Sequence, residues 1–511
     1  MRTSLSLLAA VLCGLAHAQP GTLDTSFGTG GQTLISLGSP FDLLYDLAIQ
    51  PDDKIVVAGI IGAQGGGAYQ DAMIMRFTAD GQVDSTFGTN GVVIWTGTGG
   101  LDVLRGVDID ADGKVVVAGE TQLTGGEWQM FILRLLPDGT LDPSFSGDGV
   151  LTRGTSVYNS GSYGRDVRCL PDGSILVCGY EHYTLTQPNY DAVSLWKSSA
   201  TGGIDPNFGG GSSATFTDLF QDDQSDMGNS MVVLADNSIV VGGTSKNAPD
   251  QQLGFSTFNS NGSHLGNNDE FVYAPTTGND VGNAIVRLPD GRYVLAGGAG
   301  FQGVLMGVQP NGVPDPGFGT AGRVDVEFGS SLTRVYAALL DPWDKVLVTG
   351  SYFDGTSGYF FLGRYTSTGA LDGTFGAGGV ATHQFNGFGG DGQAIGLQSD
   401  GRIVVGGHTS AGNGYDLFLL RFTNDVATGL PAATPAPAVY AYPSPFTRGF
   451  TVEGTAAGGE LVLLDALGRR VLSVPTATGR TAVEADLPRG MYSVLVGPGI
   501  QAPATLRVVR Q

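Results

Sequence analysis

The chain repeats one short pattern of polar and apolar positions seven times. Each copy opens on a polar residue and has an apolar residue two positions later; the copies occupy residues 45–54, 105–114, 165–174, 229–238, 283–292, 336–345 and 393–402. Each ends in a tight-turn sequence, most clearly Pro-Asp-Gly at 171–173, and an apolar run such as Ile-Val-Val-Ala-Gly at 55–59 follows. Asp-Gly favours a two-residue hairpin turn, so each copy predicts two antiparallel strands.

A second motif marks the other end of each period. Leu-Asp-x-x-Phe-Gly or a close variant follows a third apolar strand and precedes a fourth, at residues 83–88, 141–145, 204–209, 314–319 and 371–376. Successive copies of the first pattern are 53 to 64 residues apart, a period typical of a solenoid, a propeller or an array. Seven periods of four short strands predict an all-β fold, namely a seven-bladed β-propeller. An open β-solenoid is the alternative.

The two ends of the repeat region predict how the ring closes. The chain enters with a single strand near residues 32–37 and leaves the repeats after a third strand that ends at Phe422. One surplus strand and one missing strand make a whole blade, and their pairing would hide the open edges of the ring. We therefore expect the propeller to span residues 19–426, closed by its N-terminal strand.

The two motifs together resemble a known family. Leu-Asp-x-x-Phe-Gly, combined with a Pro-Asp-Gly-type turn and the Ile-Val-Val-Ala-Gly strand, is similar to the delta-sixty repeat family of bacterial propellers over residues 23–424. The resemblance implies a propeller fold and no particular reaction.

The N-terminus predicts export. Arg2, the apolar stretch 5–15 and the small residues Ala16 and Ala18 form a secretory signal at residues 1–18. A lipoprotein would use Cys13, but the preceding Leu12 is not small. Later apolar runs are too short to span a bilayer, so we expect a secreted or outer cell-surface protein without a transmembrane segment.

The C-terminus predicts a second, smaller domain. Residues 427–439 are rich in Pro and Ala and predict a spacer, and residues 440–511 predict about seven short strands in a small β-sandwich. Segments 442–446, 463–471 and 487–494 resemble the C-terminal sorting domain of type IX secretion cargo in Bacteroidetes, with Ser444 where that family usually has Asn. The resemblance implies the outer-membrane type IX machinery as a partner. A generic adhesive sandwich is the alternative.

Composition narrows the class of protein further. The chain has 83 Gly and 24 Pro, which disfavour helices, and its 41% hydrophobic content is sufficient for a large core. Its 48 acidic and 26 basic residues give a net charge of −22, which argues against nucleic acid as a partner.

The residues that usually carry chemistry form no recognisable set. The five His lack metal-ligand spacing, and the Asp108-x-Asp110-x-Asp112 segment is interpreted as a hairpin turn rather than a calcium loop. We expect no catalytic residues, cofactor or metal, and two free buried thiols rather than a disulfide at Cys169 and Cys178. The Asp of the second motif is expected to pair with a basic residue eight positions earlier, at Arg76, Arg134, Lys197 and Arg364.

One rim of the propeller is the candidate binding surface. The variable loops share this rim, and the first residues of the seven copies should surround the channel mouth there: Tyr45, Arg105, Arg165, Asn229, Asn283, Tyr336 and Gln393. The adjacent Arg105 and Arg165 suit a carboxylate or sulfate. The nearby aromatic residues suit sugars, namely Trp128, Tyr163, Tyr180 and Tyr183. Alternatively, the ring only makes hydrogen bonds between blades, and the aromatic residues cap the blades.

Three functions follow from this surface. The first is a non-enzymatic surface module that binds a glycan or a protein on the variable rim. The second is a secreted polysaccharide lyase or hydrolase, for which Asp46, Asp166 and His182 are the candidate residues. The third is a structural adhesin or scaffold without a small ligand.

Overall fold

The computed structural model describes the chain in two compact units, Met1–Asp425 and Val426–Gln511. It describes residues 19–62, 70–97, 100–153, 159–183, 190–211, 214–217, 225–247, 250–265, 270–273, 276, 278–328, 332–385, 387–411 and 414–425, followed by 440–442, 449–455, 460–464, 470–477, 479–484, 490–496 and 504–510. The predicted signal peptide 1–18 and linker 427–439 lie outside these residues.

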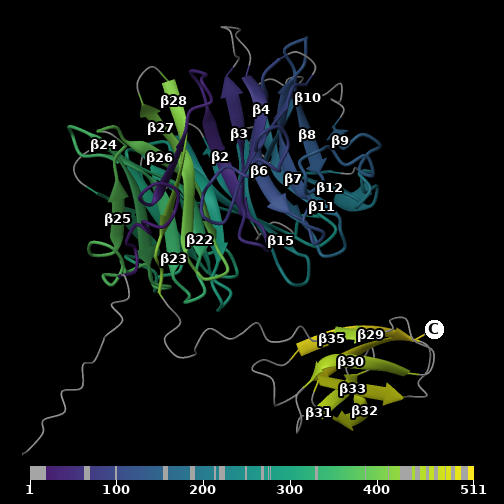
Figure 1. The fold of residues 1–511 in the computed structure, drawn as a ribbon. Helices are drawn as coiled ribbons and strands as arrows, with labels where there is room; N and C mark the ends of the chain where they lie inside the picture. The colour runs from purple at the N-terminus through teal and green to yellow at the C-terminus, as the bar shows by residue number, and fades with distance from the viewer. Residues whose placement is uncertain are drawn as a thin grey trace, which may run out of the picture. The chain divides into compact units, whose positions relative to one another are not determined.

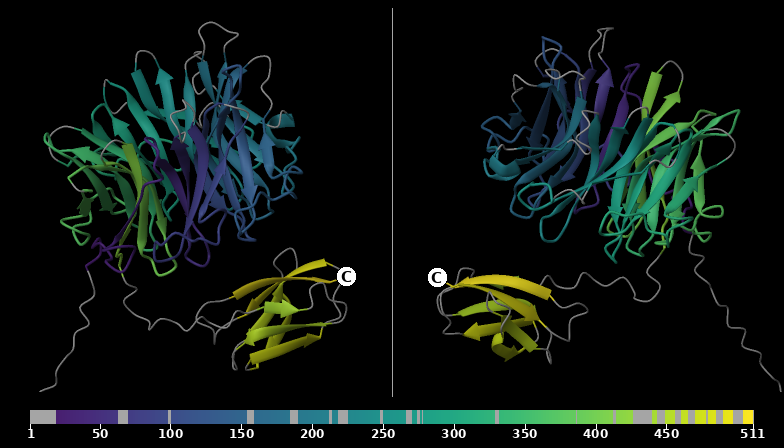
Figure 2. Two further views of the ribbon diagram at one scale, coloured as in Figure 1. Left: turned by 45° about the horizontal axis from the view of Figure 1, so that its top comes forward. Right: turned by 180° about the vertical axis from the view of Figure 1, so that it is seen from behind.

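The first unit is an all-β propeller, as the sequence predicts, and its sheets follow one another around a ring (Figure 1, Figure 2). Apart from one 3-10 turn at Phe208–Gly211, its described regular elements are strands. Four sheets each contain four consecutive antiparallel strands. They are β2 (Leu43–Ile49), β3 (Ile55–Gly62), β4 (Gln70–Phe77) and β5 (Val92–Trp95); β14 (Asp226–Val233), β15 (Ile239–Asn247), β16 (Asp250–Phe258) and β17 (Glu270–Tyr273); β18 (Asp280–Arg287), β19 (Tyr293–Ala299), β20 (Gln302–Val308) and β21 (Arg323–Val326); and β22 (Leu332–Leu340), β23 (Val346–Phe353), β24 (Gly358–Tyr365) and β25 (Val380–His383).

A fifth four-stranded sheet joins the two ends of the repeat region. It contains β26 (Gly390–Leu397), β27 (Ile403–Ala411), β28 (Gly414–Phe422) and the N-terminal β1 (Gln32–Ile35). β1 runs antiparallel to β28, with Gln32 opposite Leu420 and Ile35 opposite Leu417. An ion pair of 2.8 Å between Arg421 Nε and Asp24 Oδ2 supports this junction.

The second and third repeats share one sheet, although the sequence predicts two separate ones. The sheet has eight strands: β6 (Asp102–Ile109), β7 (Val115–Gln122), β8 (Trp128–Leu135), β9 (Val150–Thr152), β10 (Asn159–Cys169), β11 (Ile175–Tyr183), β12 (Tyr190–Ser198) and β13 (Ala214–Thr217). The cause is β10, which has 11 residues and reaches far enough for Gly161 to pair in parallel with Trp128 of β8.

The hydrophobic core lies between neighbouring sheets. Ile55 and Val57 pack in one core cluster, whereas the alternating residues Val56 and Ala58 pack in the next. Because each second strand is covered on both faces, its first three residues are all apolar rather than alternately apolar and polar.

Each inner strand contains a β-bulge that depends on a glycine of the second strand. A Cβ atom added to Gly119 would lie only 1.9 Å from the carbonyl oxygen of Val103 on the inner strand. The same contact, at 1.8 to 1.9 Å, recurs at Gly59, Gly179, Gly243, Gly297, Gly350 and Gly407. The last residue of the Val-Val-Ala-Gly strand is therefore fixed as glycine because a side chain there would force the two strands apart.

Buried ion pairs hold the rim that carries the two constant turns. As the sequence predicts, Arg76 pairs with Asp84 at 2.9 Å, and equivalent pairs join Arg134 to Asp142, Arg364 to Asp372 and Lys197 to Asp205. Arg76 also lies over the Phe87 ring and donates a hydrogen bond of 2.5 Å to the carbonyl of Pro137 in the following repeat. The recurring Asp, Phe and Arg thus connect successive repeats, and this rim is occupied by structural contacts.

The two cysteines are free, as predicted. Cys169 is opposite Ile175, and Cys178 is opposite Asp166, in the pairing of β10 with β11. Cys178 is buried, whereas Cys169 is only half-buried, and the two pack in different core clusters. They therefore lie on different faces of the sheet.

The second unit contains two small sheets around one core. The first contains β29 (Tyr440–Tyr442), β30 (Gly449–Thr455) and β33 (Gly479–Glu484); the second contains β31 (Glu460–Leu464), β32 (Arg470–Pro475), β34 (Gly490–Val496) and β35 (Ala504–Arg510). Phe450 and Val483 of the first sheet pack with Leu463 and Val494 of the second. Residues 443–448, 465–469 and 485–489, which carry parts of the sorting-domain motifs, lie outside the described residues.

Gly119→Ala should destabilise the propeller strongly, because its methyl group would meet the carbonyl oxygen of Val103. We expect a loss of about 3 kcal/mol or more in the free energy of unfolding, measured by denaturant titration with circular dichroism. Gly125→Ala is the matched control, since no heavy atom lies near its added Cβ, and it should change stability by less than about 0.5 kcal/mol. Equal stability of the two variants would refute the role of the glycine.

Candidate functional site

The structure places the seven predicted ring residues at the β-bulges of the inner strands. The strand register shifts at Tyr45, Arg105, Arg165, Asn229, Asn283, Tyr336 and Gln393. The sequence analysis placed these residues at the start of each inner strand, whereas the strands begin at least two residues earlier. A bulge bends the strand and redirects the side chain of the extra residue.

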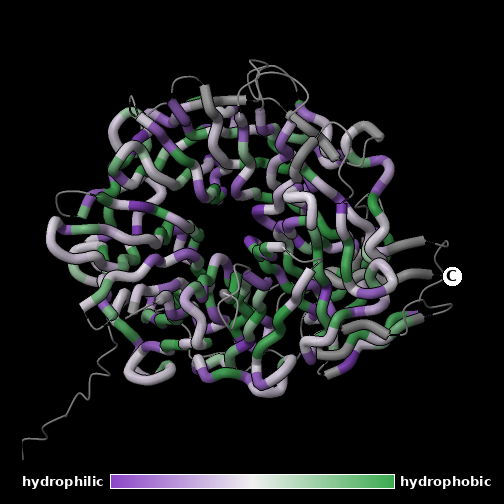
Figure 3. Tube along the Cα trace, turned by 90° about the horizontal axis from the view of Figure 1, so that it is seen from above, coloured by the Kyte–Doolittle hydropathy of each residue, from purple (hydrophilic) through white to green (hydrophobic). Residues whose placement is uncertain are grey.

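All seven ring residues line one axial cavity of about 350 Å³. Figure 3 shows the ring of sheets from above, with the inner strands around its axis. The cavity lies where the inner strands converge, so each repeat contributes one bulge residue to it. The predicted ring is therefore one spatial group.

Arg105 and Arg165 share a single buried carboxylate. Arg105 Nε lies 3.1 Å from Glu120 Oε1, and Arg165 Nη1 lies 3.8 Å from the same oxygen. Glu120 has a side-chain exposure of 4%, whereas the two arginines retain 26% and 22%. Within this cluster, two positive charges and one negative charge leave a formal excess of one positive charge, while Arg168, Asp46, Asp108 and Asp166 also line the cavity. This excess makes the region around Arg105 and Arg165 attractive to an anionic group.

Tyrosine rings hold both guanidinium groups in place. The ring of Tyr45 lies 4.2 Å from Arg105 Cζ, and Tyr180 accepts a hydrogen bond of 2.9 Å from Arg165 Nη2. Such cation–π and hydrogen-bond contacts reduce the rotamer entropy that a ligand would otherwise have to remove.

The predicted aromatic residues divide into two groups and do not line the axial cavity. Tyr163 stacks on Tyr180 at 4.5 Å and lies 5.9 Å from Trp128, between ring centroids. Tyr183 stacks instead on Tyr190 at 5.0 Å. The first group therefore contacts Arg165 through Tyr180. The second group lies where β11 ends and β12 begins.

Carboxylates in the cavity connect neighbouring inner strands. Asp46 Oδ2 accepts a hydrogen bond of 2.8 Å from the Val107 amide, and Asp166 Oδ2 accepts one of the same length from the Met231 amide. Arg168 Nη1 donates to Asp166 Oδ1 at 2.5 Å. Burial raises the pKa of Asp46 to about 7; the charge of Asp166 adds to the rise, and the Val107 amide and Arg168 oppose it.

The three candidate catalytic residues do not form one group. Asp46 and Asp166 line the axial cavity and accept backbone hydrogen bonds there, whereas His182 is absent from the residues that line it. His182 Nδ1 lies 2.6 Å from Asp191 Oδ1 on the adjacent strand. A concerted acid and base role for these residues therefore lacks the required proximity.

The Asp-rich segment of the second repeat forms the expected hairpin turn. Asp110 Oδ1 accepts hydrogen bonds of 2.9 Å from the amides of both Asp112 and Lys114, and Asp108 accepts one from the Cys169 amide. Within the described ranges, His, Cys, Asp and Glu form no group of three or more that could hold a metal ion.

Three segments of the chain, residues 50–87, 111–145 and 398–425, match the family model described as a domain of unknown function (DUF5122) beta-propeller. The chain carries a DUF5122 β-propeller domain. No curated protein sequence matches the chain.

Solved structures with a similar fold have low sequence identity to this chain. PorZ of Porphyromonas gingivalis, described as an essential surface component of the type-IX secretion system, is 15% identical with a TM-score of 0.39 over 93% of this chain and 59% of PorZ. A protein of unknown function from Dyadobacter fermentans is 11% identical, with a TM-score of 0.39 over 77% and 98% of the two chains. The polysaccharide lyase Uly1 is 12% identical, with a TM-score of 0.43 over 76% and 91%. Such likenesses carry no argument about activity.

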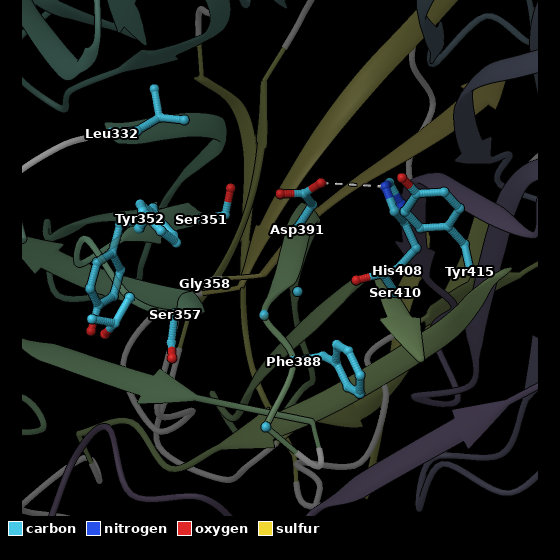
Figure 4. A pocket seen from close by; sticks show the side chains of 15 residues that line it. Leu332, Ser351, Tyr352, Ser357, Gly358, Phe388, Asp391, His408, Ser410 and Tyr415 are labelled. Carbon is cyan, nitrogen blue, oxygen red and sulfur yellow. Dashed lines mark ion pairs between the residues drawn. The ribbon is translucent and has the colours of Figure 1, made fainter. Parts of the chain in front are cut away.

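A second cavity of the propeller was not predicted from the sequence. It measures about 420 Å³, lies between the β22–β25 sheet and the sheet of β26–β28, and contains Asp391, His408 and Tyr415 (Figure 4). The recurring motifs do not indicate it, because Asp391 and His408 occupy positions that vary among the repeats. Membrane-crossing helices are also absent from the part of the chain that the structure describes.

Asp46→Asn should change how stability depends on pH. The pKa of Asp46 rises from 3.8 to about 7 on folding, so between these values the folded state binds more protons than the unfolded state. The contribution of Asp46 to stability is therefore complete below about pH 4 and decreases as the pH rises to about 7.

The variant removes this decrease. Relative to the parent protein, Asp46→Asn should gain up to about 1.4 kcal/mol per pH unit between pH 4 and 7 and nothing further at higher pH. Denaturant titrations at pH 5, 6, 7 and 8 measure the difference. Parallel stability profiles for the two proteins would contradict this assignment.

Proposed function

We propose that the chain is a secreted or cell-surface, non-enzymatic binding module that takes up an acidic group of a glycan or protein in the axial cavity. The convergence of the seven bulge residues on one cavity carries the proposal. Arg105 and Arg165 would contact the carboxylate or sulfate, since both retain exposed guanidinium surface beside the buried Glu120. Asn229, Asn283, Tyr336 and Gln393 would supply neutral hydrogen-bonding groups around it.

The proposal includes a ring of seven blades closed by β1. Seven bulged inner strands support the count, with the eight-stranded sheet taken as two blades joined by the β8–β10 contact. The pairing of β1 with β28 supports the closure. In such a ring each blade would place one bulge residue at the axis.

The access route would be the variable rim. The constant rim is occupied by Arg–Asp–Phe contacts between repeats, such as those of Arg76 and Arg134. A polysaccharide lyase or hydrolase would need a free proton acceptor beside the arginine pair. His182 is outside the cavity, and Asp46 and Asp166 inside it already accept backbone hydrogen bonds. If no glycan binds to the cavity in the test below, the remaining function is that of a scaffold without a small ligand.

We also propose that residues 1–18 direct export and that residues 440–511 form a type IX sorting domain, with the outer-membrane type IX machinery as partner. The three tail motifs and the two-sheet fold of the second unit support this assignment. The propeller would occupy residues 19–426, followed by a linker at 427–439.

Two substitutions that should change anion binding in opposite directions test the anion site. Glu120→Gln removes the carboxylate that competes for both arginines, so it should tighten binding of sulfated and uronic-acid glycans by about threefold to tenfold. Arg105→Ala should weaken the same binding by at least about tenfold, because a charge-assisted hydrogen bond is lost. Glycan-array titrations of the purified full chain measure both changes.

Arg287→Ala is the matched control, because it removes one exposed positive charge from residues that do not line the cavity. It should leave binding unchanged. If no acidic glycan binds, or if Glu120→Gln and Arg105→Ala shift binding in the same direction, the axial anion site is wrong.

The export assignment is tested with a reporter. A periplasmically directed fluorescent protein fused to residues 427–511 should reach the surface of a type IX-competent bacterium and should remain in the periplasm of a strain that lacks the secretion system. Cell fractionation measures the distribution. Retention in both strains would contradict the sorting role.

A further inference from the structure

The cavity between the β22–β25 sheet and the β26–β28 sheet opens on the variable rim. Its lining includes residues of the β23–β24 connection, such as Ser357, and of the β25–β26 connection, such as Phe388. These connections are variable loops, whereas the constant turns lie on the other rim. Its volume of about 420 Å³ lies within the range of small-molecule sites.

An aspartate and a histidine form the polar centre of this cavity. Asp391 and His408 are directly opposite in the pairing of β26 with β27, and Asp391 Oδ2 lies 3.6 Å from His408 Nε2 (Figure 4). The Asp391 side chain is 35% exposed. Burial raises its pKa, but hydrogen bonds from His408 and Ser351, together with the charges of His408 and Arg334, outweigh that effect and hold the pKa below its usual value. The cavity therefore presents an ionised carboxylate that can accept hydrogen bonds.

This pair has no counterpart elsewhere in the ring. The equivalent cross-strand pairs of the other repeats are Leu43–Ile60, Val103–Glu120, Tyr163–Tyr180, Met227–Thr244, Val281–Gly298 and Arg334–Ser351. None of them has a carboxylate on the inner strand. Since six repeats fold without Asp391, the fold does not require it.

Aromatic side chains surround the carboxylate. Phe388 is 45% exposed and Tyr415 is 36% exposed, which is unusual for side chains of this size. Tyr415 meets the His408 ring edge to face at 5.6 Å, and Tyr352 stacks on Tyr359 at 4.9 Å. In Figure 4, Asp391 lies between Tyr352 on one side and Tyr415 on the other, with Phe388 nearby. The aromatic surfaces are thus held in fixed positions around an acceptor.

The charge of this cavity distinguishes it from the axial one. Its described lining residues include no Lys or Arg, and the hydroxyl groups of Ser351, Ser357 and Ser410 add donors and acceptors. An acidic ligand would meet the Asp391 carboxylate with no Lys or Arg among the described lining residues to contact it, because the nearby Arg334 does not line the cavity. A neutral polyhydroxyl ligand would instead donate hydroxyl protons to that carboxylate and place its apolar face on an aromatic ring.

We propose that this cavity binds a neutral sugar residue, with Asp391 as the hydroxyl acceptor and Phe388 and Tyr415 as stacking surfaces. The site is independent of the acidic-group site proposed for the axial cavity. An ammonium ligand could also use an aromatic wall with a carboxylate. The three serine hydroxyls favour the sugar, because an ammonium group offers them only donors.

The test uses the purified full chain and saturation-transfer difference NMR. The probes are mono- and disaccharides of glucose, galactose, mannose, xylose, fucose and N-acetylglucosamine, together with choline and glucuronate. We expect at least one neutral sugar to bind. Phe388→Ala and Asp391→Asn should each weaken that binding by about tenfold or more. Phe388→Ala should fold normally, since the side chain is 45% exposed and lies in a loop between β25 and β26.

Two controls separate this site from other effects. Phe301→Ala removes an aromatic ring that is 76% exposed and lines neither cavity, and Arg105→Ala alters only the axial site. Both should leave neutral-sugar binding unchanged. Binding of choline alone, the absence of any neutral sugar, or equal losses in Phe301→Ala and Phe388→Ala would overturn the proposal. Since Arg105→Ala affects only the acidic probes, failure of one site is distinguishable from failure of the other.

Discussion

The contact between a glycine and a carbonyl oxygen is the constraint on which the rest of the propeller depends. At Gly119 the second strand approaches the inner strand so closely that a Cβ atom would lie 1.9 Å from the Val103 oxygen. This approach accompanies the bulge at Arg105, and the bulge in turn directs Arg105 into the axial cavity. A residue in the most apolar part of the repeat thus determines where the most polar part points.

Within each repeat, the residues that stabilise the ring are different from those that are available to bind a ligand. On the constant rim, the Arg, Asp and Phe side chains recur, and each satisfies its partners by connecting one repeat to the next. A buried ion pair of this kind leaves no charge available for a ligand. On the variable rim, the residues that follow the bulge glycine differ from repeat to repeat, for example Glu120, Ser351 and His408. Recognition can therefore vary without altering the contacts that hold the ring.

Features that recur in the sequence could be predicted from it, and features that occur once could not. The strands, the pairing of Arg76 with Asp84 and the convergence of residues such as Tyr45 and Gln393 follow from patterns repeated along the chain. The role of Glu120 does not, because its contact with Arg165 crosses from one repeat to the next at a position that varies. The merged sheet was also missed, since it depends on the length of β10 rather than on any motif.

The two cavities are adjacent and differ in their charged groups, because among the described lining residues arginines occur only in the axial one, and the wall between them is thin. Tyr336 lines the axial cavity, and its hydroxyl lies 3.5 Å from Asp391 Oδ1 in the neighbouring cavity. In the two proposed sites, Arg105 and Arg165 would attract an anion, whereas Asp391 would repel one. An extended ligand that reached both would therefore need its acidic group at the axis and its neutral part toward Tyr415. The arrangement of charge thus defines the direction in which such a ligand would lie across the rim.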